Sequence, residues 1–289
     1  MKSIVAETFR HWKAHHAPRM GAALSYYAAL ACVPLLILVV SASSLLFSKD
    51  VVEITLMHQL IATIGAEPSR YISELLHNTP LQNISTTAAI VSAVTLILAT
   101  VGIFSELRLD LNELWHTAPG DSKHTLPVFR KITTFVREKI LILSLVPILA
   151  LLLIVSILIT VLLSLVQSKT GTLGVFGGFV TLFQVIVPVA LSTAVFTLIY
   201  RIIPHRTLRW RELIRGGFAT AVLFIGGNIL IAEYIQLLVH SDIFGTASSL
   251  IGLLVWMYYS AQVFLLGASY TFVCAMRTAV ETTPISSRD

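Results

Sequence analysis

The stretch TASSLIGLLVWMYYSAQVFLLGASYTFVCAM, from Thr246 to Met276, contains no Asp, Glu, Lys or Arg. About twenty apolar residues are enough for a helix to cross the hydrocarbon core of a bilayer. The strands of a membrane barrel would instead alternate polar and apolar residues over about ten positions, which this stretch does not do. Because lipid offers no partner for backbone N–H and C=O groups, the stretch is predicted to be a membrane-spanning helix.

The rest of the chain has the same character. Hydrophobic residues make up 56% and charged residues 12%, with a mean hydropathy of +0.84, whereas soluble domains carry about 25% charged residues. The predicted fold is therefore all-α: a polytopic integral membrane protein with six transmembrane helices and short amphipathic interfacial helices, in a single transmembrane domain over residues 1–289. The predicted crossings are Ala22–Phe47, Ile84–Phe104, Ile140–Val166, Val175–Tyr200, Gly216–Val239 and Thr246–Met276.

Lys and Arg are distributed unevenly between these apolar runs. The N-terminal tail holds four, the second loop six, the fourth loop five and the C-terminal tail two, whereas the first, third and fifth loops hold two, one and none. Seventeen of the twenty therefore fall on one side of the six-crossing map. Because cytoplasmic loops carry the excess of Lys and Arg, both termini are predicted to face the cytoplasm.

The basic balance of the chain, with a pI near 9.3, also bears on its partners. The basic residues are split among short loops, whereas a nucleic-acid-binding module would gather them on one face with aromatic residues between them. Anionic lipid headgroups on the cytoplasmic side are therefore the expected partner, and nucleic acid is not. The sequence does not determine the oligomeric state, and a homo-oligomer is one of the open alternatives.

Three segments outside the crossings are predicted to be amphipathic helices at the membrane surface: Ile4–Met20, Val51–Ile64 and Tyr71–Leu76. In the first of them, His11 and His15 are spaced to share a metal. No carboxylate or Cys completes a site there, so a solvated basic face is expected instead. No metal or other cofactor is predicted for the chain.

The segment after the second crossing is also predicted to be helical, with two stripes. Leu107, Leu111, Leu114 and Trp115 form an apolar stripe. Glu106, Asp110 and Glu113 form an acidic stripe beside it. The acidic stripe either forms ion pairs or takes part in gating, and the sequence leaves both roles open. The candidates for cytoplasmic ion pairs or for headgroup contacts are Glu106, Asp110, Glu113, Arg201, Arg206, Arg209 and Arg211.

The sequence supplies little for catalysis. It contains no His-Glu-x-x-His, Cys-x-x-Cys, Gly-x-Ser-x-Gly or phosphate-binding loop. General acid–base catalysis needs positioned partner groups, and no spacing shows them. No catalytic residues are predicted, and the chain is expected not to be an enzyme.

Polar residues inside the last two crossings are the remaining candidates. They gather on narrow helical faces, which either let membrane helices pack closely or line a polar path. Pro34, Pro147 and Pro188 lie inside other crossings, where each permits a kink or a break. The candidates for a polar path are Asn228, Glu233, Tyr259, Gln262 and Ser269.

Four stretches of the chain resemble a known family. They are ALSYYA (23–28) with Pro34, LNELW (111–115), YRIIP (200–204) followed by WR (210–211), and SLIGLLVWMYYSAQ (249–262) followed by LLGA (265–268). The chain is similar in these to the YihY/BrkB family of bacterial inner-membrane proteins, and the resemblance covers nearly its whole length. The family usually has Glu after the last Gly-Ala, where this chain has Ser269, so Glu233 is a candidate substitute.

The resemblance implies a multi-pass protein of the bacterial inner (cytoplasmic) membrane. It suggests a transporter or exporter of lipid or of a small solute. A membrane scaffold that assists assembly of the cell envelope, without transport, is the alternative. A membrane-bound hydrolase or ribonuclease, an older label of the family, is the third hypothesis, and the sequence gives it no support.

Overall fold

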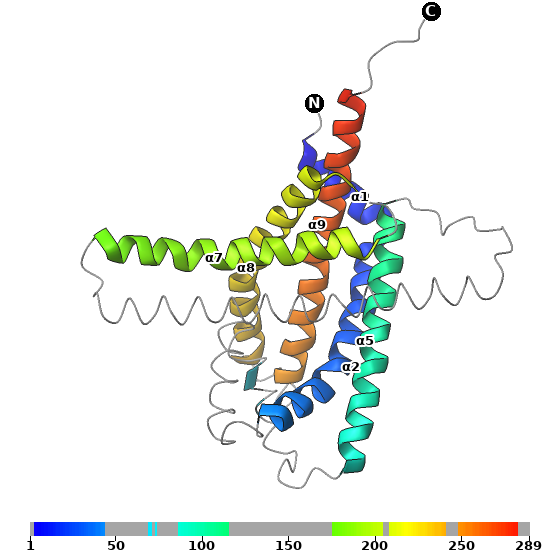
Figure 1. Ribbon diagram of the computed structural model, residues 1–289, viewed down its shortest axis with the longest axis vertical. Coiled ribbons are helices and arrows are strands. Elements are labelled where there is room, and N and C mark those ends of the chain that lie inside the picture. Colours follow the sequence, from blue (N-terminus) through cyan, green and yellow to red (C-terminus); the bar gives the residue numbers. More distant parts are fainter. Residues whose placement is uncertain are drawn as a thin grey trace, which may run out of the picture. The chain divides into compact units, whose positions relative to one another are not determined.

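A computed structural model describes residues 3–43, 69–70, 73, 86–115, 175–204, 208–240 and 248–282 (Figure 1). Helix is the only regular structure within these ranges, which confirms the predicted all-helical fold for this part of the chain. The helices are α1 (Ile4–Ala14), α2 (Ala17–Ser43), α5 (Thr86–Leu114), α7 (Val175–Ile202), α8 (Trp210–His240) and α9 (Ser248–Thr282).

Two of these helices are long and apolar enough to cross a bilayer. The qualifying segments are Trp210–Ile231 in α8 and Leu250–Thr278 in α9, and a shorter apolar helix covers Ile186–Ile202 in α7. At about 1.5 Å per residue, each of the two segments covers a hydrocarbon core of about 30 Å. The count of six crossings stays a prediction, and the run Ile140–Val166 lies outside the described residues.

The N-terminal segment differs from its prediction as one helix over Ile4–Met20. Helix α1 is capped by the Ser3 hydroxyl, which accepts a hydrogen bond from the Ala6 backbone N–H at 3.2 Å, and it ends at Ala14. His16 then takes a φ of 52°, the left-handed conformation that commonly follows a helix C-cap. A new helix, α2, starts one residue later, five residues before the predicted first crossing.

Other helices agree more closely with the predictions from the sequence. Helix α5 continues ten residues beyond Phe104, through the acidic segment predicted to be helical. Pro34 and Pro188 lie inside α2 and α7, and both helices continue past them. Pro147 and the predicted surface helix Val51–Ile64 lie outside the described residues, as does most of Tyr71–Leu76.

The described residues belong to two compact units. The first draws on residues 1–15, 110–223 and 266–289, and the second on 16–109 and 224–265, so α5, α8 and α9 each contribute to both. The core of the first unit contains Leu111, Leu114 and Trp115, which are fully buried as the predicted apolar stripe requires. The Trp115 indole N–H donates to the Ala268 carbonyl at 3.1 Å, and its ring lies 6.3 Å from that of Tyr200.

Helices α8 and α9 approach closely within the first unit through two reciprocal Gly–Thr contacts. Gly216 lies against Thr271, and Gly267 lies against Thr220. Both threonine hydroxyls bond within their own helices at 2.7 Å, Thr220 to the Gly216 carbonyl and Thr271 to the Gly267 carbonyl. Small residues with self-satisfied hydroxyls allow such close packing of membrane helices.

Candidate functional site

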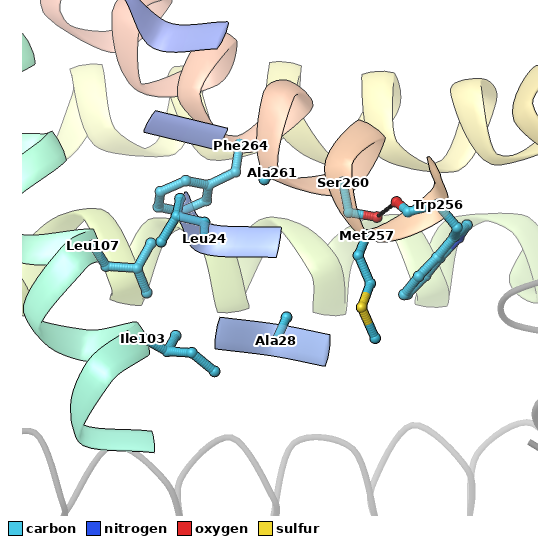
Figure 2. Close-up of a pocket in the computed structure, with 9 residues that line it drawn as sticks. All are labelled: Leu24, Ala28, Ile103, Leu107, Trp256, Met257, Ser260, Ala261 and Phe264. Carbon is cyan, nitrogen blue, oxygen red and sulfur yellow. Dashed lines mark hydrogen bonds between the residues drawn. The ribbon is translucent and has the colours of Figure 1, made fainter. Parts of the chain in front are cut away.

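The second unit contains an open cavity of about 220 Å³ between α2, α5 and α9 (Figure 2). None of its lining residues is charged, and Ser260 supplies the single hydroxyl. We call this cavity the apolar pocket. Its lining residues are Leu24 and Ala28 of α2, Ile103 and Leu107 of α5, and Trp256, Met257, Ser260, Ala261 and Phe264 of α9.

Helical periodicity explains why these residues share one cavity. Residues four apart lie above one another on the same face of a helix. The lining contains the pair 24 and 28 on α2, the pair 103 and 107 on α5, and the ladder 256, 260 and 264 on α9. Each helix thus contributes one apolar face to the pocket.

The polar groups of the lining already have partners. The Ser260 hydroxyl donates to the Trp256 carbonyl at 2.9 Å, as Figure 2 shows. The Trp256 indole N–H donates to the side-chain oxygen of Asn228 on α8 at 3.3 Å. The pocket therefore offers a bound molecule mainly carbon surface.

Asn228 is thus the predicted path residue with a bond to the pocket lining. Tyr259 instead lies against Gly227 of α8, where its hydroxyl contacts the glycine. The Gln262 side-chain amide donates to the carbonyls of Ala17 and Pro18, each at 3.4 Å. Tyr259 and Gln262 therefore join helices of the second unit, and neither lines the apolar pocket.

Two other predicted path residues differ sharply in exposure. Glu233 is exposed on α8. Ser269 is fully buried on α9, and its hydroxyl has no hydrogen-bond partner among the described residues. A continuous path through all five candidates stays a prediction.

The three acidic candidates also differ from one another. Asp110 is buried, whereas Glu106 is half-buried and Glu113 is exposed, so they do not form one uniform surface stripe. A further buried carboxylate, Glu212, lies in the first turn of α8, where the helix dipole favours negative charge. An acidic residue at the start of a long apolar helix is a signal that sequence reasoning passed over.

The described arginines of the set predicted to face the cytoplasm have different surroundings. Arg201 donates to the Leu208 carbonyl at 3.1 Å, and its guanidinium lies 5.2 Å from the centre of the Trp210 ring. Arg209 and Arg211 are exposed, and Arg206 lies outside the described residues. Arg201 of α7 thus contacts Leu208 and Trp210 around the start of α8, and the predicted pairing of this set with acids or headgroups stays a prediction.

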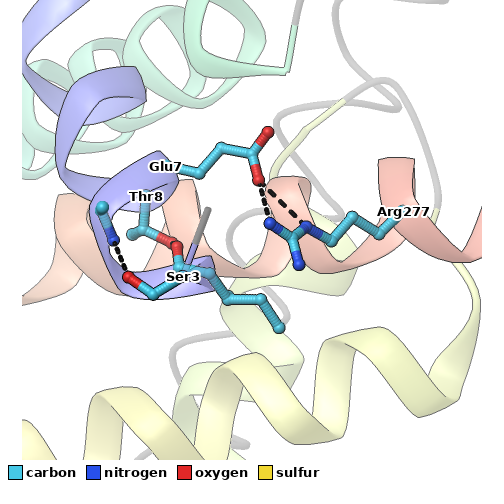
Figure 3. Close-up of polar contacts among 6 residues, drawn as sticks. Ser3, Glu7, Thr8 and Arg277 are labelled. Carbon is cyan, nitrogen blue, oxygen red and sulfur yellow. Dashed lines mark hydrogen bonds and ion pairs between the residues drawn. The ribbon is translucent and has the colours of Figure 1, made fainter. Parts of the chain in front are cut away.

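An ion pair that the sequence did not predict joins α1 to α9 (Figure 3). The Arg277 guanidinium donates two hydrogen bonds to one carboxylate oxygen of Glu7, at 2.9 Å from Nε and 2.5 Å from Nη2. The two residues are 270 positions apart, so no spacing rule pairs them. Nearby, the His11 and Phe272 rings stack at 5.0 Å, and the His11 and His15 rings lie 4.3 Å apart.

Comparison with known proteins places the chain in a family. A sequence model of the family described as "Virulence factor BrkB" matches residues 8–288. The chain belongs to this family. A protein named "UPF0761 membrane protein" from Psychromonas ingrahamii is 26% identical over 253 residues, which cover 86% of this chain and 79% of that protein.

Shorter matches point to the same group of membrane proteins. A UPF0761 membrane protein from Azotobacter vinelandii is 36% identical over 84 residues, covering 29% of this chain and 21% of that protein. One from Klebsiella pneumoniae is 36% identical over 85 residues, covering 29% and 30%. No solved structure matches the chain. The names of these relatives identify membrane proteins and give no activity.

Proposed function

We propose that this member of the BrkB family binds lipids by their acyl chains and moves them across the bacterial inner membrane, without catalysing a reaction. The observation that carries this proposal is the apolar pocket on α2, α5 and α9. A hydrocarbon chain matches carbon-lined walls, whereas a charged solute would lose its hydration there without gaining a partner.

The size of the pocket further restricts which ligands can bind there. Cavities that enclose a whole drug-sized molecule measure about 300–1,000 Å³. The apolar pocket is smaller, about 220 Å³, and is open to one side. It therefore fits a segment of a chain whose remainder lies outside, as the acyl chain of a membrane lipid would. Because lipid tails are as apolar as these walls, a chain enters the pocket from the bilayer without a desolvation cost, whereas a hydrated polar solute would have to lose its water.

Reconstitution tests this function directly. The purified protein in proteoliposomes should move a fluorescent phospholipid analogue between leaflets faster than protein-free vesicles do. A phospholipid with a photoreactive group in its acyl chain should cross-link to peptides that contain residues 24–28, 103–107 and 256–264. No lipid movement, together with co-purification of an envelope protein, would favour the scaffold alternative instead.

The topology is tested by labelling. In a variant with Cys32 and Cys274 replaced by alanine, single cysteines are introduced into the loops. Cysteine at Thr170 or Ser241 should react with an impermeant thiol reagent added outside intact cells, because these loops hold few Lys and Arg. Cysteine at Ser122 or Thr207 should react only after lysis. The reversed pattern would contradict the proposed orientation with both termini in the cytoplasm.

Glu233 gives a separate test of charge in the transport step. A charged side chain exposed on an apolar helix is costly at the bilayer centre, by about 2.5–3.5 kcal/mol on insertion scales, and less so near a boundary. If its negative charge guards the mouth of a polar path, Glu233→Gln, which keeps the size of the side chain and removes the charge, should slow lipid movement. Equal rates for both proteins would leave Glu233 as a boundary residue.

A further inference from the structure

Helix α1 has a face that docks on α9. Thr8 is buried, and its hydroxyl donates to the Ile4 carbonyl at 2.9 Å. Glu7 on the same side accepts the two bonds from Arg277 (Figure 3). His11, also on this side, stacks on Phe272. At 100° per residue, the α1 residues of this set fall within about 100° of arc, so a single face of α1 holds α9.

The opposite face of α1 is exposed and has a different composition. Val5 is 74% and Phe9 55% exposed, although both are large apolar residues. The ring of the half-buried Trp12 stacks on Phe9 at 5.3 Å, which extends the apolar stripe by another turn. Exposed Arg10 and Lys13 flank this stripe on one side. We call the five residues the outward face of α1.

The composition of the outward face selects its partner. Helices that lie in the membrane interface combine Trp, Phe and aliphatic residues with Lys and Arg at the border of the apolar face. The acidic residue of α1, Glu7, is on the docked face, so no negative charge on the outward face repels an anionic surface. A purely apolar partner would leave the two exposed cations without a role, whereas anionic headgroups match them.

The chain connection supports the same partner. Only His15 and His16 separate α1 from the 27-residue apolar helix α2. Three Cα–Cα steps span at most about 11 Å, so α1 ends close to the start of a helix that is predicted to cross the membrane. We propose that the outward face of α1 binds the surface of an anionic bilayer, while its opposite face holds the end of α9.

This proposal does not depend on lipid movement and is tested without it. In the full-length protein lacking Cys32 and Cys274, a single cysteine at Val5 is labelled with an environment-sensitive fluorophore. The labelled protein is placed in nanodiscs of phosphatidylcholine, with or without phosphatidylglycerol, that carry a spin-labelled quencher lipid. The control position is Ala14, which is exposed but lies about 180° around the helix from Val5.

Quenching at Val5 should exceed quenching at Ala14 by on the order of twofold, and phosphatidylglycerol should increase it. The double substitution Arg10→Glu and Lys13→Glu should remove that increase, because it reverses the charge beside the stripe. Equal quenching at the two positions would overturn the proposal. Strong quenching at Val5 that changes neither with phosphatidylglycerol nor with the charge reversal would overturn the proposed preference for an anionic surface. Since all four positions are exposed, monodisperse elution of each variant is expected and serves as the folding check.

Discussion

Replacing Gly267 with alanine is expected to lower the free energy of unfolding by about 1–3 kcal/mol, the usual cost of overpacking a filled core. A methyl group at this position would meet the Thr220 hydroxyl and the Tyr200 hydroxyl. Both side chains are fully buried and bonded to each other at 3.0 Å, and Thr220 also bonds to the Gly216 carbonyl. Neither has room to move aside, so the strain falls on the packing of α8 against α9.

Gly226 provides the matched control for this prediction. It is also inside a long helix, α8, but a methyl group there would meet nothing within 4 Å. Gly226→Ala should therefore be neutral or stabilising by about 0.5–1 kcal/mol, because alanine favours helix more than glycine does. Thermal unfolding of the two variants in detergent, followed by circular dichroism, gives the comparison. An equal loss of unfolding free energy in both variants would show that the Gly–Thr contacts do not stabilise the packing of α8 against α9.

The helical elements were predictable because the signal is local. Long runs without charge force helix in lipid, and α7, α8 and α9 lie where such runs were found. The end of α1 was not predictable, because it depends on His16 taking a left-handed conformation that usually belongs to glycine. Of the apolar stripe predicted from the 3.6-residue period, Leu111, Leu114 and Trp115 are fully buried, whereas Leu107 is half-buried.

The apolar pocket could not be predicted from the sequence, for a physical reason. Its residues are ordinary apolar positions of three helices, and nothing in one helix shows which turns of the others it will face. Polar residues attracted attention instead because they are rare in apolar runs. Of these, Asn228 supports the pocket through Trp256, whereas Tyr259 and Gln262 make helix contacts. The Glu7–Arg277 pair was hidden in the same way, since only the folded chain brings its ends together.

Filling the apolar pocket is expected to have the largest effect on function. Ala28 lines the cavity from α2, and Ala28→Phe would place a phenyl ring in a space of about 220 Å³ (Figure 2). If the ring displaces a chain segment that makes about ten atom contacts with the walls, roughly 1–2 kcal/mol of binding free energy is lost, because each contact contributes about 0.1–0.2 kcal/mol. That loss corresponds to about a tenfold weaker association, and lipid movement at limiting lipid analogue should slow by a similar factor.

Ala22→Phe is the matched control, because Ala22 is on the same helix but is exposed and outside the lining. The two variants add the same ring to α2, so differences in expression or in reconstitution would affect both. Lipid movement and acyl-chain cross-linking are measured together for each variant. If Ala28→Phe loses cross-linking and movement in parallel while Ala22→Phe keeps both, the pocket is the lipid site. If Ala28→Phe moves lipid as fast as Ala22→Phe, lipids do not pass through this pocket, because a ring that occupies it must exclude a chain.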